Sequence, residues 1–256
     1  MKFLNKYGSI FLFFLLWEVL SRSGFINPLF WPPFSEVLAA IVRLTRLGIL
    51  APQVEASLAR AIPGFILAVI VGVPLGLYLG TLNRFWNDFL ELPLEVLSQL
   101  NPFLLFHLII LFMGIGEAPK VTIVAWTCLW PVLFSSLNGA LGVSQDLMKS
   151  GRAFGLHRIG LIRKIIWPAA CPSVLTGVRL SLGYSLFMLI AAEMMGASSG
   201  LGFMVLRSQE AFQLDRMMAF VVVIAFLGLF LDGLFRLLSN KLRPPLDPSY
   251  LNTPGD

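Results

Sequence analysis

The chain has 256 residues, of which 57% are hydrophobic and only 13% are charged, with a mean hydropathy of +0.82. Because about 25% of the residues in a soluble domain are charged, this composition excludes an ordinary soluble protein and predicts an integral membrane protein. The net charge of +5 fits contact with anionic lipid headgroups. The basic residues lie between apolar runs without any nucleic-acid motif, so we predict no nucleic-acid partner.

Apolar runs mark the predicted membrane spans, since a helix needs about 20 apolar residues to cross the hydrocarbon core. The first run, 8–24, follows Lys2 and Lys6 as in a signal peptide, but it lacks a small-residue cleavage site. We therefore predict a retained first span and an all-α membrane protein of about six transmembrane helices in a single domain, 1–256. The predicted spans are 8–24, 62–82, 97–115, 119–139, 173–195 and 217–238.

The distribution of basic residues predicts the orientation, because cytoplasmic loops are enriched in lysine and arginine. With six spans and the N-terminus inside, most lysines and arginines fall on the cytoplasmic side. Their excess is largest in the segment 145–172. Both chain termini and this segment are therefore predicted to be cytoplasmic, and residues 25–60 external.

An amphipathic helix is predicted within the external segment. Pro33 marks a turn, Ser35 is a suitable N-cap, and Glu36 suits the first helical turn. Such a helix lies on the membrane surface or packs as a connector on its neighbours, and the sequence leaves both alternatives open. Its apolar face is predicted to consist of Val37, Leu38, Ile41 and Leu44.

The segment 145–172, which we call the basic segment, separates the fourth and fifth predicted spans. Gly155 is predicted to divide it into two short helical pieces, and Pro168 and Pro172 to close it. A structured basic segment of this kind is typical of a docking surface for a cytoplasmic partner, although it could serve only to fix the topology. Its charged residues are Asp146, Lys149, Arg152, Arg158, Arg163 and Lys164.

Gly155 and the stretch 165–168 (IIWP) have the spacing found in permease subunits of ATP-binding-cassette importers, which the chain resembles from about residue 30 to 248. In that family the cytoplasmic loop begins Glu-Ala-Ala and ends Ile-x-Leu-Pro. Four further stretches are similar to the branch for sulfonates, taurine, nitrate and related small anions. They are 33–37 (PFSEV), 72–80 (GVPLGLYLG), 112–120 (FMGIGEAPK) and 191–202 (AAEMMGASSGLG).

The chain departs from the family pattern at a few positions. Lys149-Ser150-Gly151 stands where the family has Glu-Ala-Ala, and a glycine weakens a helix by about 1 kcal/mol relative to alanine. Trp167 replaces the usual leucine, and His107 stands where many relatives carry proline.

The resemblance implies a type I importer permease (MetI-like) fold in the bacterial inner membrane, with a permease core at 61–248. It also implies a second permease chain, most simply in a homodimer, two ATP-binding subunits and an extracytoplasmic substrate-binding protein. The phosphate-binding motif G-x-x-x-x-G-K-[ST] does not occur in this chain, so ATP and Mg are expected in the partner subunits. We predict that the chain itself is not an enzyme and holds no cofactor or metal. The residues implied in coupling to the ATPase are Leu147, Met148, Arg152, Ala153, Phe154, Gly155, His157 and Arg158.

Two ionisable residues within spans are candidates for the substrate path, because such groups tend to face a cavity or a partner. His107 could donate a hydrogen bond to a small anion or simply bond a backbone carbonyl. Glu193 suits a gate or a helix-packing contact better than an anion site. Asp232 and Arg236 are four residues apart and can form a structural pair on one helix face.

The resemblance implies translocation of a small anion such as a sulfonate, taurine or nitrate. A vitamin precursor or an aromatic solute, carried by the same class of importer, is an alternative. An ATP-independent secondary transporter would be expected to show repeated halves, and a membrane-embedded enzyme clustered His, Asp or Glu; neither pattern is visible.

Overall fold

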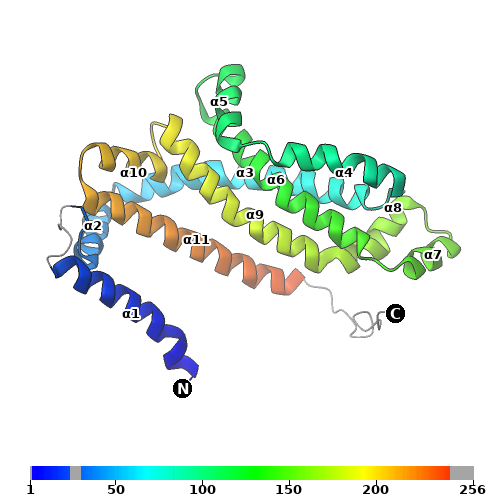
Figure 1. Ribbon diagram of the computed structural model, residues 1–256, viewed down its shortest axis with the longest axis horizontal. Helices are drawn as coiled ribbons and strands as arrows, with labels where there is room; N and C mark the ends of the chain where they lie inside the picture. Colours follow the sequence, from blue (N-terminus) through cyan, green and yellow to red (C-terminus); the bar gives the residue numbers. More distant parts are fainter. Residues whose placement is uncertain (1, 24–29, 83, 243–256) are drawn as a thin grey trace. The chain divides into compact units, whose positions relative to one another are not determined.

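The computed structural model describes residues 2–23, 30–82 and 84–242, and every regular element in these ranges is a helix (Figure 1). The chain divides into two compact units, unit 1 (1–59 and 190–228) and unit 2 (60–189 and 229–256). The helices are α1 (Lys2–Arg22), α2 (Phe34–Arg46), α3 (Leu50–Leu79), α4 (Arg84–Ser98), α5 (Pro102–Met113), α6 (Glu117–Leu141), α7 (Gln145–Ala153), α8 (Arg158–Leu161), the π-helix η1 (Ile162–Ile166), α9 (Trp167–Gly196), α10 (Leu201–Glu210) and α11 (Leu214–Leu242).

Four stretches of helix are long and apolar enough to cross a membrane, and α4 with α5 forms a fifth candidate if the pair is one span. The four confirm the predicted spans at 62–82, 119–139, 173–195 and 217–238. The predicted span 8–24 falls on α1, but it extends beyond the described residues and stays a prediction. The four stretches are Leu50–Leu79, Glu117–Leu141, Ile159–Gly196 and Leu214–Lys241.

The prediction of one continuous helix over 97–115 is wrong, because α4 and α5 meet at an angle of 81° (Figure 1). Asn101 caps α5 by accepting a hydrogen bond from the Phe103 amide at 2.9 Å, and Pro102 occupies the first turn. Proline lacks an amide hydrogen, so it begins a helix well but cannot continue the previous one. With 12 residues, α5 is about 18 Å long and cannot cross the hydrocarbon core by itself.

In unit 1, α2 packs on its neighbours, which selects one of the two alternatives left open by the sequence. Val37 and Leu44 are buried against Leu201 of α10 and Phe220 of α11. Leu38 is 43% exposed and lies outside this face, so its predicted place there is wrong.

The predicted N-cap of α2 is also wrong. The helix begins at Phe34 after Pro33, and Ser35 lies inside its first turn. The Ser35 amide and hydroxyl both donate to the Glu18 carboxylate of α1, at 3.0 and 2.9 Å. A carboxylate from another helix thus satisfies a first-turn amide that would otherwise lack a partner.

In unit 2, small residues let α3, α6 and α9 approach closely. A Cβ at Gly76 of α3 would lie 2.5 Å from the Leu133 carbonyl oxygen of α6, and one at Gly177 of α9 would collide with Ser135. Close packing of this kind is how membrane helices associate without a hydrophobic driving force. The core around these contacts contains Val73, Leu77, Val132, Ala140, Ile166, Ala170 and Val174.

Candidate functional site

The basic segment begins with helix α7 and turns sharply at Gly155. The Ser144 hydroxyl accepts a hydrogen bond from the Leu147 amide and caps α7. Gly155 has φ +77°, a backbone conformation that glycine adopts readily and a β-branched residue does not. The structure therefore confirms that Gly155 divides the segment, and it places α7 on one side and α8 on the other.

The second half of the basic segment continues into the next span. The prediction that Pro168 and Pro172 close the segment is therefore wrong. From Arg158 the helix runs without interruption through η1 and α9 to Gly196. The Trp167 amide donates to the Ile162 carbonyl, five residues earlier. This wider turn accommodates Pro168, which has no amide hydrogen to donate.

The side chains around Gly155 differ in exposure. Phe154 is 87% exposed, and Arg152, Ala153 and His157 are exposed as well. Leu147 is half-buried. The Arg158 side chain lies outside the described residues. Among the described side chains of this turn, Phe154 offers the largest apolar surface to a partner.

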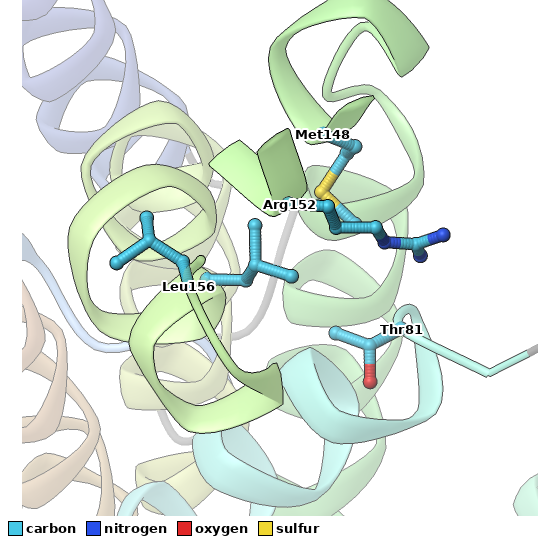
Figure 2. A pocket seen from close by; sticks show the side chains of 5 residues that line it. Thr81, Met148, Arg152 and Leu156 are labelled. Carbon is cyan, nitrogen blue, oxygen red and sulfur yellow. The ribbon is translucent and has the colours of Figure 1, made fainter. Parts of the chain in front are cut away.

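Met148 and Arg152 of α7 line a hollow of about 280 Å³ within unit 2. Thr81, from the turn after α3, lies beneath them, and Leu156 and Leu161 complete the lining (Figure 2). Met148 also packs against the core of unit 2. This side chain therefore anchors α7 to its own chain.

Gly151, where the family pattern has alanine, has a structural explanation. The residue is buried, and a Cβ at its position would lie 2.7 Å from Leu161 Cδ2 and still closer to Ile165 Cδ1. The glycine therefore lets α7 pack closely against α8 and η1.

His107 lies on α5 and is exposed. Its Nδ1 is 2.9 Å from the Phe103 carbonyl oxygen, so the predicted hydrogen bond to a neighbouring backbone carbonyl is present. The bond uses only the Nδ1 atom of the imidazole ring, and Nε2 is not part of it. The role of His107 in a substrate path stays a prediction.

Glu193 is fully buried in unit 1 and caps the N-terminus of α10. Its carboxylate accepts hydrogen bonds at 2.9 Å from the Ser57 hydroxyl and from the Gly202 amide. Ser57 Oγ in turn accepts from the Leu201 amide at 2.9 Å. The Glu193 and Ser57 oxygens therefore satisfy two of the first-turn amides of α10 that would otherwise lack a partner.

The loop before α10 is shaped around the same carboxylate. Gly200 has φ +116°, and a Cβ there would collide with Glu193. The Gly200 amide donates to Gln53 Oε1 at 2.7 Å. We call Gln53, Ser57, Glu193 and Gly200–Gly202 the Glu193 cluster. Its bonds describe a helix-packing contact, one of the three roles that the sequence suggested, and a role of Glu193 as a gate or in the substrate path stays a prediction.

Two ionic groups in unit 2 include residues that the sequence analysis did not assign. Glu117 lies 2.9 Å from Lys120 Nζ and 3.1 Å from Arg60 Nη2, and both basic side chains are buried. Glu117 and Lys120 lie in the first turn of α6, and Arg60 lies within α3. In the sequence, only their positions next to the predicted spans 62–82 and 119–139 marked them.

The second group confirms the predicted pair of Asp232 and Arg236, whose charged atoms are 2.9 Å apart. Arg179 of α9 adds a bidentate contact to the same carboxylate, at 2.6 and 3.1 Å. The Nε and Nη2 atoms of Arg179 donate to the two carboxylate oxygens of Asp232, and this paired contact holds α9 beside the last turns of α11 within unit 2.

Comparisons with known proteins agree with the resemblance seen in the sequence. The chain is 30% identical over 247 residues to the taurine transport system permease protein TauC of Escherichia coli (strain K12), covering 93% of this chain and 88% of that protein. It is also 30% identical over 227 residues to SsuC of Bacillus subtilis (strain 168), named for aliphatic sulfonates transport, covering 89% of this chain and 82% of that protein.

A chain of the MetNI methionine ABC transporter in an inward-facing conformation has the same fold, with a TM-score of 0.64 at 17% identity, over 80% of this chain and 95% of that chain. Residues 72–244 match the family of binding-protein-dependent transport system inner membrane components. The chain belongs to this family and is a multi-pass membrane permease of the ABC importer type, in its sulfonate, taurine and nitrate branch.

Proposed function

We propose that two copies of this chain form the translocation path for a small anion. A substrate-binding protein delivers the anion from outside, and ATP hydrolysis in separate subunits drives its import. The N- and C-termini and the basic segment lie in the cytoplasm. Relatives named for sulfonates, taurine and nitrate support a substrate of this size and charge. ATP and Mg are bound by the partner subunits, and this chain transmits the motion.

The observation that carries the proposal is the exposed turn at the end of α7. Phe154 is 87% exposed, and the positive φ of Gly155 directs the chain away immediately after it. Arg152 and His157 flank this apolar side chain and can contact polar groups of the ATP-binding subunit. An exposed aromatic side chain with a polar rim is a common form of binding hot spot.

Transmission would use the attachment of α7 to the rest of unit 2. Met148 packs against the unit 2 core, and Gly151 sits against Leu161 and Ile165. Because η1 runs into α9 without a break, a displacement of α7 is passed directly to a membrane span. This is a rigid-body movement driven by nucleotide at a distant site.

The test compares Gly155→Val with Gly155→Asn in the complex reconstituted with its ATP-binding subunits. A Cβ at this position would meet nothing within 4 Å, so the two variants differ mainly in backbone preference. Asparagine tolerates positive φ, whereas valine resists it by about 1–2 kcal/mol. We expect valine to reduce ATPase association and coupled activity roughly tenfold, and asparagine to retain most of both.

Both variants must insert and purify like the unsubstituted chain for the comparison to count. Equal association and activity in the two would mean that the basic segment only fixes topology, which contradicts the proposal. Uptake that continues without ATP would instead favour a secondary transporter.

A further inference from the structure

Three charged side chains of unit 2 lie at the protein surface although they belong to membrane spans. Arg179 comes from α9, and Asp232 and Arg236 come from the last turns of α11, which lie beside α9 (Figure 1). The Arg179 side chain is 44% exposed and the Arg236 side chain 61% exposed. Because an exposed charge is costly next to hydrocarbon, a polar group of another molecule is expected to cover these residues. We call the three residues the Arg179 cluster.

The cluster has an excess of positive charge and of hydrogen-bond donors. The Asp232 carboxylate accepts from Nε and Nη2 of Arg179 and from Nε of Arg236, at 2.6, 3.1 and 2.9 Å. One carboxylate therefore faces two guanidinium groups. Neither arginine side chain has another polar partner within the part of the chain that the structure describes. Since a guanidinium has further N–H donors, the Nη1 groups of both arginines remain available to the oxygens of an anion.

The cluster lies near one boundary of the membrane, at the end of the spans where the basic segment begins α9. Along the helix axis, Arg179 is about 9 Å from the start of the span 173–195, and Arg236 about 3 Å from the end of the span 217–238. Phe235 packs against core residues from the start of α9, so the end of α11 lies at the same boundary. Arginine side chains near helix ends extend toward the headgroups, so this pair can reach a lipid phosphate.

The surroundings of the cluster favour lipid over a water-filled path. Leu180 follows Arg179 directly, and Leu229 lies one turn before Asp232, deeper in the membrane; both leucines are exposed. A water-filled path would be expected to continue with polar side chains at this depth. A basic pair next to an exposed apolar surface instead matches a phospholipid, which has an anionic phosphate and apolar acyl chains.

We propose that the Arg179 cluster binds the phosphate group of an anionic phospholipid, in the leaflet next to the basic segment. Both arginines donate to the phosphate oxygens, while Asp232 holds the two guanidinium groups together. The acyl chains lie against Leu180 and Leu229. The bound lipid screens the exposed charges and connects α9 with α11. This inference goes beyond the proposed function, because it depends on neither the transported solute nor an ATP-binding subunit.

Native mass spectrometry of the purified full-length chain can measure the binding. The delipidated protein is titrated with phosphatidylglycerol and, separately, with phosphatidylcholine that has the same acyl chains. We expect the first phosphatidylglycerol to bind at least about fivefold more tightly, because its headgroup has a net negative charge. Equal affinities for the two lipids would overturn the proposal.

Substitution of Arg236 locates the preference. Arg236→Gln should abolish it and leave the contact of Arg179 with Asp232 in place, whereas Arg236→Lys keeps the charge and should retain most of it. Lys241→Gln is the matched control, because it also removes one exposed positive charge near the end of α11 but lies outside the cluster. A preference that survives Arg236→Gln, or that falls equally with Lys241→Gln, would overturn the proposal.

Two further outcomes separate a lipid from other occupants. Glycerol phosphate has the anionic group without acyl chains, so a millimolar excess should not displace bound phosphatidylglycerol; displacement would indicate a site for a free anion. A dimer that dissociates in Arg236→Gln at every lipid concentration would indicate an interface between copies of the chain. Either result would overturn the lipid assignment. Failure here is distinct from failure of the importer coupling tested with Gly155, because no ATP-binding subunit is present.

Discussion

The basic segment and the Glu193 cluster both contain a glycine with positive φ, yet the side chains around the two glycines differ in solvent exposure. Around Gly155, Phe154 and its polar neighbours are exposed. Around Gly200, the carboxylate of Glu193 is fully buried and accepts hydrogen bonds from Ser57 and Gly202. The side chains of the first region are accessible, as the proposed contact with the ATP-binding subunit requires, whereas the second region uses its polar groups for hydrogen bonds within its own unit.

The difference shows how a motif residue can be assigned to packing or to a partner. A buried acid that accepts hydrogen bonds from an amide and a hydroxyl of the same unit stabilises the fold. An exposed aromatic side chain at the tip of a turn contributes little to the fold and is available for binding. Substitutions in the Glu193 cluster should therefore change stability, and those at Phe154 should change association.

The largest effect is expected for Glu193→Ala. Removal of the carboxylate leaves the Gly202 amide without its acceptor and removes the acceptor of the Ser57 hydroxyl in a buried site. We expect a loss of about 3 kcal/mol, which corresponds to roughly 6–12 °C in the midpoint of thermal unfolding. The measurement is the thermal unfolding of the detergent-solubilised protein.

Glu210→Ala is the matched control, because Glu210 is exposed at the other end of α10. Its effect should stay within about 0.5 kcal/mol. Similar midpoints for the two variants would show that Glu193 does not stabilise α10, and the contrast between the two regions would then be lost.

An intermediate effect is expected for Gly151→Leu, which tests the attachment of α7. A side chain here would collide with Leu161 and Ile165, and overpacking costs about 1–3 kcal/mol. Because only α7 has to move, we expect faster hydrogen exchange in α7, with little change in global unfolding. Gly160→Ala, where the nearest atom would lie at 3.5 Å, should leave the exchange unchanged. Unaltered exchange in both variants would contradict the close packing of α7.

The sequence predicted the fold class, most of the spans and the division at Gly155, because these depend on apolar run length and local backbone preference. The break at Asn101-Pro102 was also readable, as an N-cap followed by proline at the first helical position, but the uncharged run across it suggested one helix. Pro168 was the sequence signal for the π-helix before it, because proline has no amide hydrogen to donate, but we read it as the end of the segment.

The partners of the ionisable residues were less predictable. Glu193 and Ser57 are 136 residues apart, and Arg179 and Asp232 are 53 residues apart. Contacts at such separations depend on helix packing, so the sequence alone could identify the charged residues in spans without pairing them. The pair of Asp232 and Arg236 could be predicted because both lie on one helix face.

The smallest effect on stability, and a large one on association, is expected for Phe154→Ala. The side chain is 87% exposed, so its removal should change the free energy of unfolding by less than about 0.5 kcal/mol. If Phe154 is the apolar contact with the ATP-binding subunit, co-purification of that subunit should fall at least about tenfold, a loss typical of a binding hot spot. Ile159→Ala is the matched control, since Ile159 is 79% exposed on the next helix and is not among the predicted coupling residues. Full association with Phe154→Ala, or an equal loss with both variants, would contradict the assignment of Phe154 and leave Arg152 and His157 as the next residues to substitute.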